Sequence, residues 1–228
     1  MKNIAITGAA RGLGLELARQ HLAAGDRVFA FVRNPSRADQ LNALAGGSAG
    51  MLSVHEMDVC DEASVRAGAA SIGDLALDIL YNNAGLEGPN LPELESSDWA
   101  AWNEVFATNV QGPLRVLQAF LPSLREGSKI LSLSSSIASS TWPMGGHYAY
   151  GASKAALVRL MRGVAIDLKD RGIIVGTIHP GWVQTDMGGP DALLPVEESV
   201  KGCRDVAAKW TLEQSGDFIQ WTGEPQPW

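Results

Sequence analysis

A tyrosine and a lysine four positions apart are the residues of this chain best placed to move a proton. They are Tyr150 and Lys154. On a helix this spacing puts both side chains on one face, about one turn apart. An ammonium near a phenol favours the phenolate, so a group with an ordinary pKa of about 10 can exchange protons closer to neutral pH. The pair therefore predicts acid/base chemistry at Tyr150.

A glycine-rich turn near the start of the chain predicts a nucleotide-binding site. Gly8, Gly12 and Gly14, with Leu13 among them, follow a strand-like segment and open a helix-like one. Without Cβ atoms, the glycines let backbone N–H groups approach a pyrophosphate at the positive end of the helix. Their spacing, Gly-x-x-x-Gly-x-Gly, differs from the commoner Gly-x-Gly-x-x-Gly. A proton donor combined with a dinucleotide site predicts hydride transfer to or from a carbonyl.

These residues need a scaffold, and short apolar segments alternate with helix-like segments along the chain. Strands are expected at residues 4–6, 27–32, 51–54, 77–81, 129–133 and 173–178. Helices are expected at 15–24, 63–72, 99–124 and 148–170, with Pro113 bending the third. The alternation predicts an α/β fold, a single Rossmann-type doubly wound parallel sheet with helices on both faces. Ligands of such sheets bind beyond the carboxyl ends of the strands.

The composition is that of an ordinary globular chain. With 228 residues, 46% of them hydrophobic and 19% charged, one domain over residues 1–228 is expected, with a flap around residues 186–198. The net charge of −7 argues against nucleic acid and anionic membrane as partners. Cys60 and Cys203 make neither a disulfide framework nor a metal site, and no apolar stretch reaches the length of a membrane span. A cytoplasmic location is expected by default.

The end of the second strand favours NADP(H) over NAD(H). An acidic residue there would hold the ribose 2′-hydroxyl of NAD, but Val32 and Arg33 occupy this position. Arg33, together with Arg11 in the glycine turn, could hold a 2′-phosphate, because a guanidinium matches phosphate oxygens bidentately. After the third strand, Asp58 and Val59 could receive the adenine, although Asp58 could equally cap the following helix.

Four motifs in this order make the chain resemble the short-chain dehydrogenase/reductase family over essentially its whole length. They are Thr7-Gly8-x-x-x-Gly12-x-Gly14, Asn82-Asn83-Ala84-Gly85, Tyr150-x-x-x-Lys154 and His179-Pro180-Gly181. Residues 179–189, Tyr148-Ala149-Tyr150 and Pro227-Trp228 make it most similar to the C-factor/sniffer-type carbonyl reductases of that family. A surface Tyr/Lys pair on an amphipathic helix would leave the other three motifs without explanation.

The resemblance implies a division of labour among the catalytic residues. Tyr150 would donate a proton to the carbonyl oxygen while NADPH delivers hydride to its carbon. Lys154 would lower the pKa of Tyr150 and hold the nicotinamide ribose. Asn109 matches the family asparagine that holds a water between Lys154 and solvent.

A serine at the end of the fifth strand would hydrogen-bond the substrate oxygen, but three serines are consecutive there. The family pattern Ser-Ser-x-x-Gly favours Ser136, with Ser135 as the alternative. Ser139 stands where the family often has glycine, so the register stays open. Of the two nearby tyrosines, only Tyr150 has the lysine spacing, and Tyr148 is expected in the pocket wall.

The resemblance also implies contacts from the loops after the fourth and sixth strands. Cofactor contacts are expected from Asn83, Ala84, Gly85, Pro180, Gly181, Val183 and Thr185. An apolar substrate pocket is expected from Leu86, Trp142, Met144, His147, Trp182, Met187 and Leu193. Such a lining, without an arginine to clamp a carboxylate, favours a hydrophobic ketone, aldehyde or quinone.

The functional hypothesis is an NADPH-dependent carbonyl reductase acting on a small-molecule carbonyl or alcohol. Family members usually pair through the long helix and the Tyr/Lys helix, so a homodimer or homotetramer is expected. One alternative is an alcohol dehydrogenase working in the oxidative direction. Another is an NADP(H)-binding signalling or sensor protein whose turnover is incidental.

Overall fold

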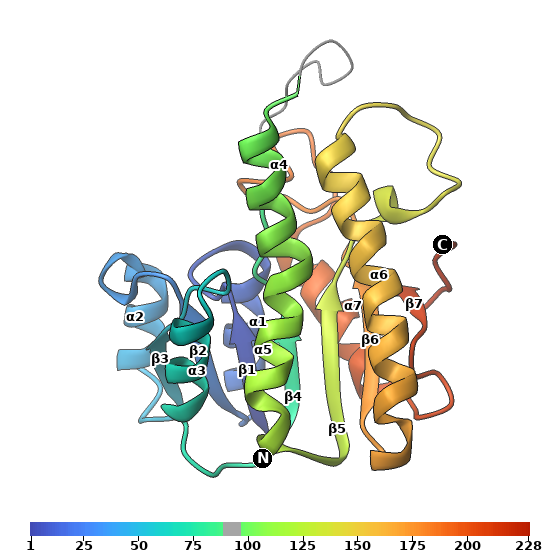
Figure 1. Ribbon diagram of the computed structural model, residues 1–228. Helices are drawn as coiled ribbons and strands as arrows, with labels where there is room; N and C mark the ends of the chain where they lie inside the picture. Colours follow the sequence, from blue (N-terminus) through green and yellow to red (C-terminus); the bar gives the residue numbers. More distant parts are fainter. Residues whose placement is uncertain (89–96) are drawn as a thin grey trace.

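One parallel sheet forms the centre of the molecule (Figure 1). The computed structural model describes residues 1–88 and 97–228. Within them the strand order is β3-β2-β1-β4-β5-β6-β7, and every neighbouring pair is parallel. The strands are β1 (Asn3–Thr7), β2 (Arg27–Val32), β3 (Leu52–Glu56), β4 (Leu77–Asn82), β5 (Leu124–Leu133), β6 (Ile174–His179) and β7 (Phe218–Gln220). The order reverses between β1 and β4, which makes this pair the switch point of the sheet.

Helices cover both faces of the sheet, which confirms the predicted doubly wound α/β fold. One face is covered by α1 (Gly12–Ala23), α2 (Asp39–Gly46) and α7 (Val196–Lys209). The other is covered by α3 (Glu62–Ala70), α5 (Gly112–Phe120) and α6 (Tyr148–Leu168), with α4 (Trp99–Phe106) leading into α5. Among the described helices, none combines the length and apolar character needed to span a membrane.

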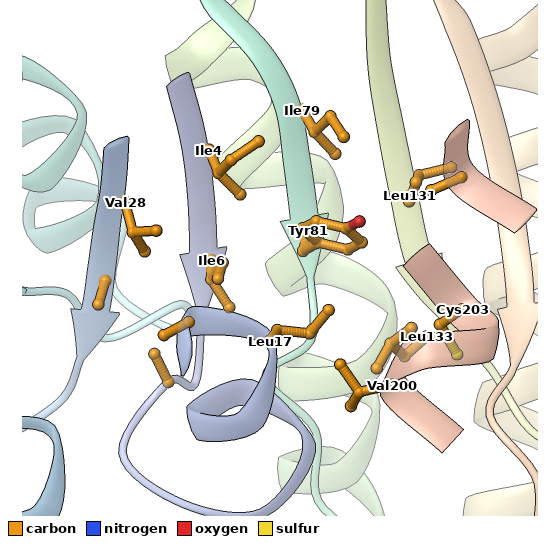
Figure 2. Close-up of a cluster of buried hydrophobic side chains, with 14 of the residues drawn as sticks. Ile4, Ile6, Leu17, Val28, Ile79, Tyr81, Leu131, Leu133, Val200 and Cys203 are labelled. Atoms are coloured by element: carbon orange, nitrogen blue, oxygen red, sulfur yellow. The ribbon is translucent and has the colours of Figure 1, made fainter. Parts of the chain in front are cut away.

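Alternate strand residues face opposite core layers, as the period of a strand requires. In β1, Ile4 and Ile6 belong to the layer under α1 and α7, while Ala5 belongs to the opposite layer. Figure 2 shows the first layer, where Leu17 of α1 and Val200 of α7 lie with the side chains of the central strands. Because the central strands are covered on both faces, they are apolar almost throughout.

The expected helix over residues 99–124 is interrupted. Between α4 and α5 the backbone forms one π-helical turn, Ala107–Gln111. Pro113 is the second residue of α5 and follows the π-helical turn directly. The interruption therefore precedes the proline, and it places Asn109 in the π-helical turn.

Three elements, α2, α7 and β7, lie outside the sequence expectations. The three-residue strand β7 adds to the sheet edge beside β6. A strand this short has no readable period of its own, so its pairing with β6 defines it.

Candidate active site

The candidate active site lies at the carboxyl edge of the sheet, where β1 and β4 meet. The Asn83 side-chain amide donates to the main-chain oxygens of Thr7 and Gly8, over 2.8 and 3.0 Å. The Thr7 hydroxyl oxygen accepts from the backbone N–H groups of Asn83 and Ala84, each over 3.1 Å. These hydrogen bonds hold the loop after β4 against the glycine turn at the switch point of the sheet.

The glycine turn has a backbone that fits a pyrophosphate. Gly8 and Gly12 have φ angles of +67° and +54°. A Cβ on Gly8 would lie 2.8 Å from the Ala84 Cα, and one on Gly14 would overlap the Gly8 oxygen. Helix α1 begins at Gly12, and the side chain of the preceding residue, Arg11, does not cap the N–H groups of its first turn. The free N–H groups and the positive end of α1 are therefore available to an anion.

The two arginines expected to hold a 2′-phosphate lie near this turn. The Gly8 N–H donates to the Phe31 oxygen over 2.9 Å, so β2 ends beside the glycine turn and is followed there by exposed Arg33. Arg11 pairs instead with Asp186 in the loop after β6, with 2.8 Å between Nη1 and Oδ2 and both side chains mostly exposed. This exposed pair is worth little energy, but it links the glycine turn to that loop.

Asp58 is not the cap of α3, so that alternative is wrong. Asp61 caps the helix, because its side chain accepts from the Ser64 N–H over 2.9 Å. The Asp58 carboxylate accepts instead from the Cys60 N–H, also over 2.9 Å. Its contact with adenine, beside buried Val59, stays a prediction.

The loop after β6 reaches the glycine turn at Thr185. A Cβ on Gly12 would lie 3.4 Å from the Thr185 Cγ2. Pro180 and Val183 are buried in this loop, and Gly181 has a φ of +90°. The residues expected along the nicotinamide therefore lie in one loop that runs from β6 toward the glycine turn.

The expected flap over residues 186–198 begins in a closed loop and ends in a helix. The Gln184 N–H donates to the Leu194 oxygen over 2.9 Å, and the Leu194 N–H donates to the Trp182 oxygen over 3.2 Å. Helix α7 starts at Val196. The last three residues of the expected flap thus belong to α7, and movement of the rest stays a prediction.

Tyr150 and Lys154 lie in the first turns of α6, as their spacing predicts. The Lys154 side chain is buried, its Nζ donates to the Leu133 oxygen over 2.8 Å, and it lies 5.6 Å from the centre of the Tyr150 ring. A Cβ on Gly85 would lie 3.5 Å from both the Lys154 Nζ and the Asn109 Oδ1. Glycine therefore lets the loop after β4 pass close to the catalytic helix.

Asn109 is fully buried in the π-helical turn and connects three elements. Its Oδ1 accepts from the Leu86 N–H over 2.8 Å, and its Nδ2 donates to the Leu86 oxygen over 2.7 Å. The same Nδ2 donates to the Ser153 hydroxyl over 2.9 Å. Asn109 thus holds the loop after β4 beside the residue that precedes Lys154. The water that the family resemblance implies here stays a prediction.

Ser135, the alternative left open by the sequence, lies close enough to Tyr150 for its side chain to lower the pKa of the phenol. Ser135 has an extended backbone directly before the short 3₁₀ helix Ser136–Ala138. Ser136, preferred on the family pattern, donates its backbone N–H to the His179 Nδ1 over 3.2 Å. Burial lowers the pKa of His179 to about 4, so the ring is neutral and can accept this hydrogen bond. The geometry at Tyr150 therefore favours Ser135 over Ser136.

The pKa of Tyr150 is raised, whereas the family resemblance implies that Lys154 lowers it. The pKa of Tyr150 is raised to about 12, mainly by burial and also by the Glu87 carboxylate, while Ser135 acts to lower it. Burial also lowers the pKa of Lys154 to about 8. Both shifts have one cause, because a low-dielectric environment disfavours the charged form of each group. Without a bound ligand, Tyr150 therefore holds its proton.

Glu87 is a site residue that the sequence reasoning missed. Its Oε1 lies 3.4 Å from the His147 Nδ1, so it joins the loop after β4 to the start of α6. His147 precedes α6 with a φ of +50°, a strained left-handed conformation for a residue other than glycine. The motif Asn82-Asn83-Ala84-Gly85 ends two residues before Glu87, and only that proximity could have indicated it.

The structure leaves most of the expected substrate pocket open. Leu193, Met144, Trp182, Met187 and Trp142 are 82%, 68%, 56%, 46% and 38% exposed. Leu86 and His147 are half-buried beside Asn109 and Glu87. A groove of about 450 Å³ lies elsewhere, between α7 and the segment after β7, and none of the expected pocket residues lines it. That these residues line a substrate pocket stays a prediction.

A family model described as short chain dehydrogenase matches residues 2–192. The chain therefore belongs to the short-chain dehydrogenase family and is an oxidoreductase of that family, as the four motifs predict. C-signal of Myxococcus xanthus is 42% identical over 169 residues, which are 72% of this chain and 100% of C-signal.

Two solved structures resemble the whole chain. An NADPH-bound carbonyl reductase from chicken fatty liver superposes with a TM-score of 0.93 at 34% identity, covering 100% of this chain and 99% of that one. Carbonyl reductase Sniffer of Drosophila melanogaster superposes with a TM-score of 0.94 at 30% identity, covering 100% of both chains. The expected similarity to carbonyl reductases is confirmed.

Proposed function

We propose that this chain is an NADPH-dependent reductase that converts a carbonyl group into an alcohol, with Tyr150 as the proton donor. The observation that carries the proposal is the environment of the Tyr150 phenol. It is protonated, with Ser135 lowering its pKa and Lys154 close by, and Lys154 lies at the loop after β4 that also packs against the glycine turn. The chicken carbonyl reductase with NADPH bound supports the same chemistry and the same cofactor.

The residues present fit NADP(H). The glycine turn and the positive end of α1 would hold the pyrophosphate, and Arg33 would hold the 2′-phosphate. The loop after β6, from Pro180 to Thr185, would contact the nicotinamide. Bound NADPH supplies the hydride that the carbonyl carbon accepts.

Tyr150 supplies the proton that completes the reduction. With its pKa raised to about 12, the phenol is protonated at neutral pH and can give its proton to the carbonyl oxygen. The Ser135 hydroxyl would donate a hydrogen bond to the same oxygen and stabilise the charge that develops there. Carbonyl, hydride and proton together make the alcohol and leave Tyr150 as phenolate.

Lys154 is placed to stabilise that phenolate and return its proton. A pKa near 8 lets the ammonium give up a proton at a pH only slightly above neutral. Its hydrogen bond to the Leu133 oxygen holds the amine while Tyr150 changes charge. Asn109 positions the neighbouring loop through Leu86 and Ser153, and the path to solvent is proposed to run past it.

The substrate is proposed to be a hydrophobic ketone, aldehyde or quinone. The residues expected to form a rim around the site are apolar or aromatic and largely exposed, Trp142 and Trp182 among them. An open rim suits substrates of varied size, because few contacts constrain the part remote from the carbonyl. The active unit is proposed to be a homodimer or homotetramer located in the cytoplasm.

A signalling role is the second candidate, favoured by the identity with C-signal over that protein's full length. In that case binding of NADP(H) would matter and turnover would be incidental. The Tyr150, Lys154 and Ser135 arrangement argues for chemistry, because binding alone requires no proton donor.

The decisive experiment measures NADPH and NADH consumption with aromatic ketones, aldehydes and quinones. Tyr150→Phe is the test variant and Tyr148→Phe the matched control, two residues earlier on the same helix. We expect NADPH-dependent turnover that Tyr150→Phe abolishes and Tyr148→Phe largely retains. Reverse assays with NADP⁺ and alcohols test the oxidative alternative.

Tight NADPH binding without turnover would favour the signalling role. Failure to bind either nucleotide would refute the proposal. Ser135→Ala and Ser136→Ala distinguish the two serines, because kcat should fall strongly only when the serine at the carbonyl oxygen is replaced.

A further inference from the structure

The segment after β7 runs back along the edge of the sheet (Figure 1). The Gln220 N–H donates to the Glu224 oxygen over 2.8 Å and so closes a turn. The Gln226 N–H then donates to the Phe218 oxygen, also over 2.8 Å. Residues 225 and 226 therefore pair antiparallel with β7, which leaves the next two residues beside the loop that follows β5.

The main-chain oxygen of Trp228 accepts three hydrogen bonds from that loop. The Ser140 N–H donates over 2.8 Å and the Ser140 hydroxyl over 2.5 Å. The Ser139 hydroxyl donates over 3.3 Å and also lies 2.7 Å from the Thr141 hydroxyl. Three donors therefore converge on this one oxygen atom. Trp228 as a whole is 47% exposed.

The loop held in this way joins Ser135 to the helix that carries Tyr150. Its start is also tied to β6, because the Ser136 N–H donates to the His179 Nδ1. Beyond Ser136, its other main-chain hydrogen bonds are local, from the N–H groups of Ala138, Ser139 and Trp142 to oxygens three residues earlier. Ala138 packs with Val158 of α6 and Phe218 of β7 in a small apolar cluster. The strand that carries the tail thus also supports the 3₁₀ turn next to Ser135.

We infer that Trp228 is a positioning residue, whose main-chain oxygen fixes the loop at Ser139 and Ser140 and thereby holds Ser135 at Tyr150. The inference rests on the proposed function, because it assigns Ser135 to the reacting carbonyl. The cofactor cradle is built from the loops after β1, β4 and β6. Loss of the Trp228 oxygen should therefore lower kcat and leave NADPH binding unchanged.

The expected size follows from the number of hydrogen bonds. One net hydrogen bond changes an equilibrium constant by roughly 2- to 10-fold, so losing three should lower the equilibrium constant that favours the productive loop by roughly 10-fold or more. A displacement of Ser135 by about 1 Å is enough for a kcat loss of that order.

The experiment compares removal of residues 227–228 with Trp228→Ala. Removal takes away the accepting oxygen but keeps the hydrogen bond between Gln226 and Phe218. Trp228→Ala keeps the oxygen and removes only the indole. Ser140→Ala removes one donor without shortening the chain. The readouts are kcat, KM, the Kd for NADPH, thermal stability, and hydrogen–deuterium exchange of peptides spanning residues 136–142.

We expect faster exchange and a kcat lower by roughly 10-fold after removal, a smaller loss in Ser140→Ala, and near-normal behaviour in Trp228→Ala. Unchanged exchange, or unchanged kcat despite faster exchange, would overturn the inference. Equal loss in Trp228→Ala would also overturn it, because the indole would then be responsible. If the intact protein reduces no carbonyl, the proposed function fails, and exchange alone decides whether Trp228 holds the loop.

Discussion

Acidification should destabilise the folded protein through His21, a buried histidine away from the active site. Its ring is 4% exposed, with Nδ1 2.9 Å from the Asp26 Oδ2 and Nε2 3.3 Å from the Tyr81 hydroxyl. Burial lowers the pKa of His21 to about 4; the Asp26 hydrogen bond opposes this shift, and the Arg204 charge adds to it. The neutral ring donates to Asp26 and accepts from Tyr81.

The sign follows from proton binding in the two states. Unfolded, His21 has a pKa of 6.5, so between pH 6.5 and about 4 the unfolded chain binds more protons than the folded one. This contribution to stability is fully present above pH 6.5 and is lost as the pH falls through that window. The pKa difference amounts to about 3 kcal/mol in total, of which about 2 kcal/mol is lost by about pH 5.

Urea denaturation at several pH values between about 7.5 and 5 tests this, with the wild type compared with His21→Asn. The asparagine amide can still donate to Asp26 but does not titrate. We expect the free energy of unfolding to fall more steeply with acid in the wild type, by about 2 kcal/mol over this range. The titration of His179, which is also buried, contributes equally in both proteins and so cancels in the comparison. Parallel pH profiles would refute the reasoning.

Three further predictions concern the active site. Glu87→Gln should lower the pKa of Tyr150, because the Glu87 carboxylate raises it. The pH profile of alcohol oxidation should therefore move to lower pH, and an unchanged profile would contradict this prediction. Arg33→Asp should lower the NADPH/NADH ratio of kcat/KM by roughly 10-fold or more, and a retained ratio excludes Arg33 from the 2′-phosphate. Gly14→Ala should abolish NADPH binding in calorimetry because its Cβ overlaps a main-chain oxygen, whereas Gly46→Ala, with open space around it, should bind normally.

Much of the fold could be predicted because its signals are local. The expected strand over residues 27–32 coincides with β2, since a strand covered on both faces is an unbroken apolar run. The helix over residues 99–124 was expected to bend at Pro113, and its irregularity is instead the π-helical turn that carries Asn109. The hydrogen bonds of Asn109 to Leu86 and Ser153 join segments far apart in the chain, so no local pattern indicates them.

The protonation chemistry of the site shows the same division. The Tyr150–Lys154 spacing predicts two neighbours on one helix face, because 3.6 residues make a turn. It does not predict that burial raises the pKa of Tyr150 and lowers that of Lys154, since burial depends on what packs over the helix. Glu87 acts on Tyr150 from a separate loop, which no spacing within α6 reveals.

The sequence by itself determined the alternating α/β order, the glycine cradle and the Tyr/Lys pair, because each depends on residues close together in the chain. Only the tertiary structure decided that Ser135 meets Tyr150, that Asp61 and not Asp58 caps α3, and that Trp228 reaches the loop after β5. The three consecutive serines have the same side chain and differ only in the direction in which that side chain points. That direction is set where the backbone leaves β5, and contacts from β6, β7 and α6 determine this point.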